Sequence, residues 1–187
     1  MNFKKLVGEK VYLSPISADS IELFTKWMND FGVTDYTARS QFVFSYEAEK
    51  AWFDNKVKSK DYMLSIVTLK DDEVVGNIEL QSIDSVNREA TLGILIGEEK
   101  NRNKGYGTEA ISLLLDYGFN YLNLNNISLT VLACNDRAKR CYEKVGLKEF
   151  GRKRKCKFVN GKYYDLIYMD ILSEEFKEEY IKNKNVK

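Results

Sequence analysis

The sequence predicts an α/β (α+β) fold in which helices flank a central sheet that is mixed but mostly antiparallel. Three observations lead to this prediction. Strand-like runs follow one another between residues 62 and 97 with only short turns between them. A glycine-rich turn at 102–108 then leads into a run with helical periodicity. Further on, Asn160-Gly161 separates two more strand-like runs, and Asn-Gly is a strong signal for a two-residue hairpin.

The first sixty residues predict one strand and two helices. Alternation at 10–14 indicates a strand, which Pro15 closes. Ser17 is suited to cap a helix whose apolar residues recur at helical spacing: Ile21, Phe24, Trp27 and Met28. Ser45 is suited to cap a second helix, whose apolar residues are Ala48, Trp52, Phe53 and Val57. The segment between them, 31–39, has no clear period and is expected to be a loop.

The remaining elements follow from the same signals. Strands are expected at 62–69, 74–81, 90–97, 127–134, 155–159 and 162–171. Helices are expected at 108–122 and at 138–145, where Gly146 is a natural terminator. The charged tail at 174–187 is expected to be a frayed helix. With no repeat and no linker in the chain, we expect a single domain at 1–187, with its core at about 10–172 and a charged tail at 173–187.

Composition excludes several classes of function. The 29 basic and 28 acidic residues leave a net charge of +1, so no global field attracts nucleic acid. The chain has no histidine, which excludes Ser-His and Cys-His catalysis, and we expect no metal. Three cysteines without CxxC spacing fit a reducing compartment. No apolar run approaches the roughly 20 residues of a membrane span, and a cytoplasmic protein is expected.

The turn between the 90–97 strand and the next helix has the features of an anion site. Its residues are Arg102, Asn103, Lys104, Gly105, Tyr106, Gly107 and Thr108. The free N–H groups and the dipole of a helix N-terminus favour an anion, and glycine lets the backbone approach a phosphate closely. Arg102 and Lys104 would add positive charge. The alternative is a turn that needs glycine for its geometry alone.

A family resemblance rests on this turn and on a second motif. The order β-α-α-β-β-β-α-β-α-β-β, with Arg-x-x-Gly-x-Gly after the fourth strand, resembles the GNAT superfamily of acyl-CoA-dependent N-acetyltransferases. The segment 135–147 holds the Asn-x-x-Ala and Tyr-Glu-Lys-x-Gly elements that recur there. The resemblance covers about residues 10–172. Val-Tyr-Leu-Ser-Pro at 11–15 and the segment 159–165 are similar to the branch of ribosomal-protein alanine, spermidine and some aminoglycoside acetyltransferases.

The resemblance implies a cofactor and roles for particular residues. Acetyl-CoA would give its acetyl group directly to a primary amine. The 102–108 turn would bind the pyrophosphate, and the backbone of Ile94, Leu95 and Ile96 would bind the pantetheine arm. Tyr142 would be the general acid, unless it only packs on the cofactor. Asn135 would bond the CoA arm, or be simply a turn residue that ends a strand.

The general base is not evident from the motifs. Members of this branch often have an acidic residue where this chain has Thr91. Glu79 and Glu89 are the nearby candidates, although each also suits a solvated strand position. At pH 7, deprotonating a lysine-like amine costs about 4.6 kcal/mol, against about 1 kcal/mol for an α-amine. A site without a strong base should therefore favour an α-amine.

We expect a protein or peptide N-terminus as the acceptor ahead of a small amine, and the resemblance leaves a polyamine, an aminoglycoside and an amino sugar as the small-amine alternatives. A non-catalytic CoA-binding sensor or scaffold is the alternative from another class. A homodimer would follow the habit of the family. The aromatic segment 31–44 is either an acceptor wall or core. The basic run 152–157 suits a solvated edge strand, with a nucleic-acid patch, an acidic acceptor or the CoA 3′-phosphate as alternatives.

Overall fold

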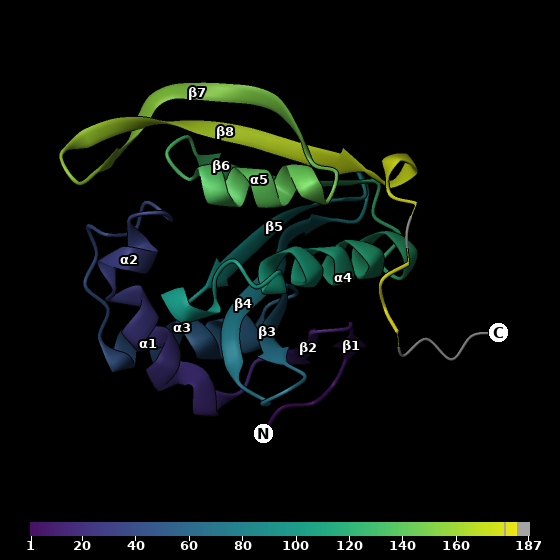
Figure 1. The fold of residues 1–187 in the computed structure, drawn as a ribbon, viewed down its shortest axis with the longest axis horizontal. Coiled ribbons are helices and arrows are strands. Elements are labelled where there is room, and N and C mark those ends of the chain that lie inside the picture. The colour runs from purple at the N-terminus through teal and green to yellow at the C-terminus, as the bar shows by residue number, and fades with distance from the viewer. Residues whose placement is uncertain (178, 183–187) are drawn as a thin grey trace.

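One eight-stranded sheet organises the protein (Figure 1). The computed structural model describes residues 1–177 and 179–182. In this part the strand order is β1-β2-β3-β4-β5-β6-β8-β7, and each neighbouring pair is antiparallel except β5 and β6. The strands are β1 (Leu6–Val7), β2 (Val11–Pro15), β3 (Tyr62–Thr68), β4 (Val74–Asp84), β5 (Glu89–Ile96), β6 (Asn126–Leu132), β7 (Lys148–Val159) and β8 (Lys162–Leu172).

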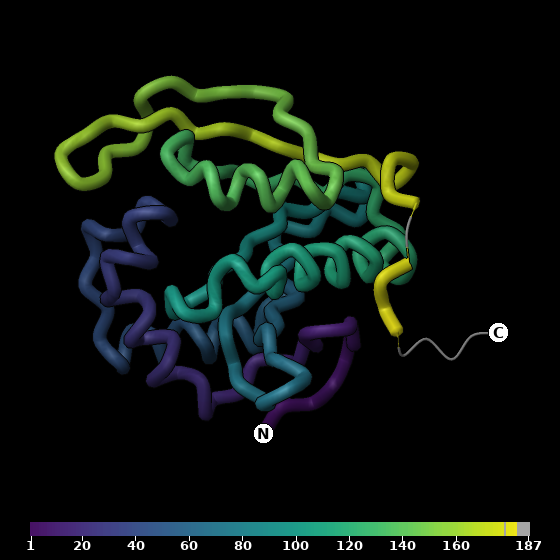
Figure 2. The backbone as a smooth tube through the Cα atoms, in the orientation of Figure 1, coloured from purple at the N-terminus to yellow at the C-terminus, as the bar shows by residue number. Residues whose placement is uncertain are grey.

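Five α-helices surround the sheet in this part of the chain. They are α1 (Ile21–Met28), α2 (Phe31–Thr34), α3 (Tyr46–Lys58), α4 (Tyr106–Asn120) and α5 (Asp136–Lys144). The tube in Figure 2 shows α4 running across the middle of the molecule, with α5 beside it and the first two helices gathered to one side. α4 packs on β1 to β5 and against α5. Its central leucines, Leu113 to Leu115, are therefore fully buried on more than one face.

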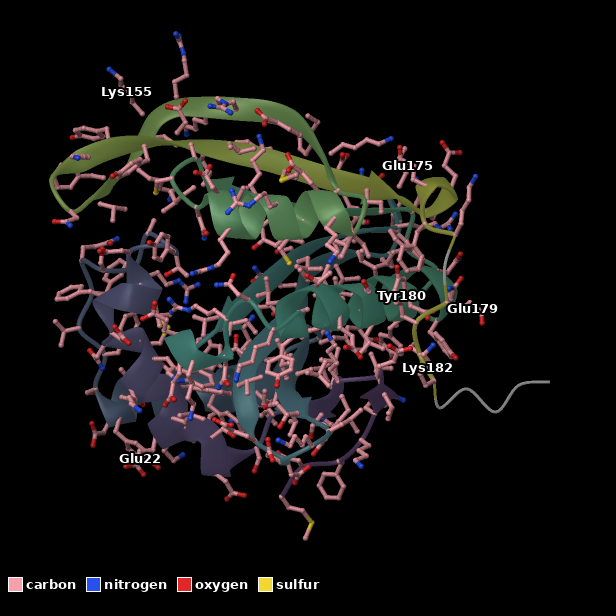
Figure 3. The ribbon with its side chains drawn as sticks, viewed as in Figure 1. Glu22, Lys155, Glu175, Glu179, Tyr180 and Lys182 are labelled. Atoms are coloured by element: carbon pink, nitrogen blue, oxygen red, sulfur yellow. The ribbon has the colours of Figure 1, made fainter. Side chains whose placement is uncertain are left out.

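The expected strands are present, with two differences at the sheet edges. β1 was not predicted, because a two-residue strand is too short to show alternation. β7 begins at Lys148, seven residues before the predicted start, and lies at the edge of the sheet. Its basic run is a solvated edge strand, as expected, and Lys155 points away from the body of the molecule in Figure 3.

Turn and cap residues behave as predicted. Asn160 and Gly161 have φ values of 47° and 77°, which is the backbone of a two-residue hairpin turn. Gly146 ends α5 with a φ of +98°. Ser45 accepts a hydrogen bond from the Ala48 N–H in α3, as predicted. Ser17 caps the 3₁₀ turn at 18–20, where it accepts from the Asp19 N–H, and the N-cap of α1 itself is Ser20.

Two helical predictions need correction. The segment 31–39 is not entirely loop: it begins with α2, whose first turn forms because Asp30 accepts a hydrogen bond from the Gly32 N–H at 2.7 Å. The buried face of α3 also differs from the prediction. Phe53 is buried, but Val57 is 59% exposed, and Glu49 lies inside.

The described part of the tail is not a frayed helix. After a short 3₁₀ turn (Ser173–Glu175), it passes the C-terminal end of α4 towards β1. The buried Asp116 of α4 accepts hydrogen bonds from the backbone N–H groups of Tyr180 and Ile181, at 2.7 and 3.0 Å. Lys182 donates its N–H to the Val7 carbonyl. Residue 178 and residues 183–187 lie outside the described structure. None of the described helices is both long and apolar enough to cross a membrane.

Candidate active site

The two halves of the sheet separate beside the glycine turn. The parallel pairing of β5 with β6 covers only three residue pairs, from Glu89–Asn126 to Thr91–Ser128. β5 continues to Ile96 along β4, and β6 continues to Leu132 along β8. The facing edges of β5 and β6 are therefore open beyond Thr91, and they line a cavity of about 860 Å³ that also receives the 102–108 turn.

Part of the open edge of β5 presents unpaired backbone. The Gly97 N–H donates to the Val75 carbonyl of β4 at 3.0 Å. Because successive residues of a strand direct their backbone groups to opposite edges, those of Ile94 and Ile96 point towards the separation. Those of Leu95 point to β4. Of the three residues predicted to bind an extended ligand through their backbone, two therefore face the open edge.

The glycine turn forms an uncapped helix N-terminus at the end of this edge. Gly105 is the N-cap of α4, with a φ of +85°, and has no side chain that could cap the first N–H groups. A Cβ at Gly107 would meet only Ile94 and Ile96, at 3.7–3.8 Å, which is ordinary contact. Packing does not require glycine at 107, so its lack of a side chain leaves room for a ligand to approach. A phosphate anion fits this geometry.

Arg102 differs from the other residues of the turn. Its Nη2 donates to the carbonyl oxygens of Gly32, at 3.0 Å, and Gly97, at 2.9 Å. Its Nε is buried and has no hydrogen-bond partner among the described residues. Burial lowers the pKa of Arg102 from its ordinary value, and the nearby Arg137 adds to this effect. The side chain therefore joins α2 to the end of β5. Lys104, the other positive charge of the turn, is exposed and is the one residue of 102–108 that does not line the cavity.

Tyr142 and Asn135 enter the cavity from the opposite side, through α5 and the turn before it. Tyr142 is 8% exposed, and burial raises its pKa well above the ordinary value of 10. Asn135 is the N-cap of α5, and its Oδ1 accepts a hydrogen bond from the Ala138 N–H at 3.1 Å. The amide nitrogen is not used by this cap. Beside them, Thr108 and Cys141 join α4 to α5 through a 3.2 Å O···S hydrogen bond.

The two candidate bases lie in different places. Glu79 of β4 lines the cavity opposite Gly93 of β5, and Lys56 donates a 2.6 Å hydrogen bond to its carboxylate. Glu89 is exposed at the start of β5 and is not among the residues that line the cavity. The structure thus brings Glu79 to the same cavity as Tyr142, and leaves Glu89 outside it.

The segment 31–44 forms one wall of the cavity, together with α3. The guanidinium of Arg137 from α5 lies over the ring of Tyr36, with the guanidinium carbon 5.3 Å from the ring centroid. From α3, Glu49, Trp52 and Lys56 line the cavity. Glu49 is not among the predicted site residues, although its spacing of three and seven residues from Trp52 and Lys56 places all three on one helix face.

Comparisons with known proteins identify the family and similar folds. Residues 10–148 match the acetyltransferase (GNAT) domain family. A Bacillus subtilis protein, named provisionally as the ribosomal N-acetyltransferase YdaF, is 34% identical over 111 residues, which are 59% of this chain and 60% of that protein. The spermidine N(1)-acetyltransferase of Escherichia coli K12 is 36% identical over 110 residues, 59% of each chain. These alignments thus span about three fifths of each relative.

Solved structures are similar over a longer stretch. The structure of spermidine N-acetyltransferase from Vibrio cholerae in complex with CoA and spermine has a TM-score of 0.81 with this chain. The two are 23% identical, and the similarity covers 88% of this chain and 96% of that one. At this identity the comparison supports the fold.

Proposed function

Because the chain belongs to the acetyltransferase (GNAT) domain family, we propose that it is an N-acetyltransferase that transfers the acetyl group of acetyl-CoA directly to a primary amine. One observation carries the proposal. The open edge of β5 leads straight to the uncapped N-terminus of α4, so that one continuous backbone surface suits an extended amide chain that ends in phosphates. The relatives named above, among them enzymes whose names specify spermidine, support an amine acceptor.

The cofactor would be held mainly by backbone groups. The N–H groups at 105–108 and the exposed Lys104 would hold the pyrophosphate. Ile94 and Ile96 would pair with the pantetheine arm in the manner of an added strand. The Asn135 amide nitrogen, which the α5 cap leaves free, would donate to the same arm. Acetyl-CoA supplies the activated acetyl group and the thiolate leaving group.

We assign the protein's part of the chemistry to Tyr142 and Glu79. Holding amine and thioester together in the cavity supplies much of the rate. The pKa of a tyrosine is ordinarily above that of a thiol, and burial raises the pKa of Tyr142 further. Its hydroxyl therefore keeps its proton and can donate a hydrogen bond to the thiolate. Glu79, positioned by Lys56 opposite Gly93, is the better placed of the two candidate bases, because Glu89 lies outside the cavity.

Acetyl-CoA-dependent thiol release with Tyr142→Phe tests the proposal. If the hydroxyl acts on the leaving group, we expect kcat to fall by about 10² or more, within the usual range for a general acid. The affinity for CoA, measured by calorimetry, should stay within twofold of the wild type. Glu89→Gln serves as the control and should keep wild-type turnover.

The rival function is a non-catalytic CoA-binding module. It predicts CoA binding without thiol release for any amine among alanine-terminated peptides, spermidine, aminoglycosides and amino sugars. An absence of CoA binding would instead contradict the assignment of the glycine turn. Turnover that Tyr142→Phe leaves unchanged would contradict the role of the hydroxyl and leave the activity standing.

A further inference from the structure

Glu49 is a buried carboxylate that the mechanism above does not use. It lies in the first turns of α3, it is only 6% exposed, and it lines the cavity. Among the residues that the structure describes, no hydrogen bond or ion pair to its carboxylate is found, whereas Glu79 in the same cavity is bonded to Lys56. Its carboxylate oxygens are not among the fully buried unpartnered atoms, so they open onto the cavity that the residue lines. A largely buried carboxylate that faces a cavity without a partner is a suitable site for a cationic ligand.

Helix stability does not explain this burial. An acidic side chain in the first turns of a helix interacts favourably with the helix dipole. Glu47 stands in the same part of α3 and can provide this interaction while exposed to water. The dipole therefore accounts for an acidic residue near Ser45, and it does not account for one that is directed into a cavity.

The surroundings of Glu49 suit a positively charged ligand. Trp52, one turn further along α3, lines the cavity beside it, and an aromatic face next to a carboxylate is a favourable site for a cation. Arg39 is the positive charge that acts on the carboxylate, and it lies beyond ion-pair distance. Burial raises the pKa of Glu49, and the charge of Arg39 lowers it by a smaller amount. A ligand with its own positive charge would supply the close partner that the carboxylate lacks.

The position of Glu49 separates it from the reacting centre. Lys56, which bonds the proposed base Glu79, lies seven residues further along α3, or about 10 Å along the helix axis. A group at Glu49 would therefore be a different group from the amine that reacts beside Glu79. The two carboxylates line the same cavity and would contact two ends of one acceptor.

We propose that Glu49 is the recognition site for a second cationic nitrogen of the acceptor, so that the preferred acceptors are diamines or polyamines. This inference rests on the proposed acetyltransferase function and names its substrate class. It departs from the α-amine preference expected from the sequence, because that expectation concerned deprotonation of the reacting amine and did not include a second charged group.

The test compares 1,4-diaminobutane with butylamine, which lacks the second nitrogen. For the wild type, KM for the diamine should be at least tenfold below KM for the monoamine. Glu49→Gln keeps the shape and removes the charge, and it should abolish this preference while leaving KM for butylamine and for acetyl-CoA within twofold. Glu49→Asp keeps the charge on a shorter side chain and should restore part of the preference. Glu47→Gln is the matched control and should behave as the wild type.

Two results would overturn the inference: a wild type without preference for the diamine, or a preference that Glu49→Gln leaves intact. Turnover would then stand without the Glu49 site. Calorimetry of diamine binding to the CoA-loaded protein separates this failure from a failure of the proposed function. If no amine is acetylated, diamine binding that Glu49→Gln removes would still support the site, and the absence of such binding would contradict it. Circular dichroism establishes that each variant is folded.

Discussion

Arg102 links the two walls of the cavity through a single guanidinium nitrogen. It donates to Gly32 in α2 and to Gly97 at the end of β5. Gly97 is itself tightly packed, since a Cβ there would lie 2.0 Å from the Trp27 indole. The motif predicted Arg102 as a charge for a phosphate. Its Nη2 contacts also suit it to position the wall formed by α2, and we propose this second role beside the predicted one, because Arg102 still lines the cavity.

Arg102→Lys should therefore change acceptor binding more than cofactor binding. Lysine keeps the charge but cannot reproduce the fixed geometry of the guanidinium, so α2 loses its link to β5. We expect the acceptor KM to rise about fivefold or more, with the CoA dissociation constant within twofold of the wild type. Lys104→Gln, which removes an exposed charge from the same turn, should do the reverse. An equal loss of CoA affinity in both variants would mean that Arg102 binds the phosphate, as the motif predicted.

At the scale of single elements, α5 has a structural cap and, in the proposed function, would also contribute to binding. The N-cap of the helix, Asn135, accepts a hydrogen bond from the Ala138 N–H. Two side chains of the helix, Arg137 and Tyr142, line the cavity. A single helix cap thus orients one side of the site. The element also shows why Asn135 was ambiguous in the sequence: a cap and a ligand contact use different atoms of one amide.

Asn135→Asp separates these two roles. Aspartate caps helices as well as asparagine does, so the free energy of unfolding should stay within about 0.5 kcal/mol of the wild type. It replaces the amide donor by a negative oxygen, and CoA affinity should fall about tenfold. Asn135→Ala should in addition lose about 1 kcal/mol of stability in urea denaturation. If the Asp variant binds CoA normally, Asn135 acts only as a cap.

α3 illustrates the limit of reading periodicity in a single element. The predicted apolar face consisted of Ala48, Trp52, Phe53 and Val57, but of these four residues only Phe53 is a buried core residue. The helix buries Glu49 instead, because this face is directed into the cavity as well as into the core. Hydrophobic periodicity assumes that a buried position is apolar, and so it fails where a helix lines a polar site.

At the scale of the whole molecule, two groups of strands share few backbone contacts. The strands β1 to β5 form the first group and β6 to β8 form the second. Three parallel residue pairs between β5 and β6 connect the two groups. α4 and α5 contact each other across the separation. Thr108 and Cys141, which are hydrogen-bonded between the two helices, both line the cavity. The cavity is a property of this arrangement, and it places the charges of α3, β4 and α5 around one space.

The pH dependence of stability should reveal the buried charge. Burial raises the pKa of Glu49 above its ordinary 4.5, so the native protein binds this proton more tightly than the unfolded chain. The associated stabilisation is complete below pH 4.5 and is lost as the pH rises through the folded-state pKa. Glutamine does not titrate. The melting temperature of Glu49→Gln minus that of the wild type should therefore increase between pH 4 and pH 7.

Differential scanning calorimetry in matched buffers measures this difference. Glu47→Gln, on the same helix and exposed, controls for changes in helix charge and should show no comparable increase. A constant difference for Glu49→Gln across this range would mean that Glu49 is as well solvated or paired in the folded protein as in the unfolded chain.

The sequence alone determined the features that depend on local chemistry. Gly105 and Gly107, the Asn160-Gly161 hairpin and the serine caps are specified by residues next to each other in the chain. The order of most elements along the chain, the family and the glycine turn could therefore be predicted. The motif of Tyr142 could be identified for the same reason. These features need no knowledge of what packs against them.

Only the tertiary structure decided the contacts between distant segments. The two carbonyls bonded by Arg102 come from α2 and β5, and the neighbours of Glu49 come from α3 and the segment 31–44. The separation of β5 from β6 likewise depends on where pairing stops. Such contacts join segments that are far apart in the chain and meet only in the folded protein. Local periodicity does not encode which segments meet. They decide which charges face a ligand, and hence the proposed choice of acceptor.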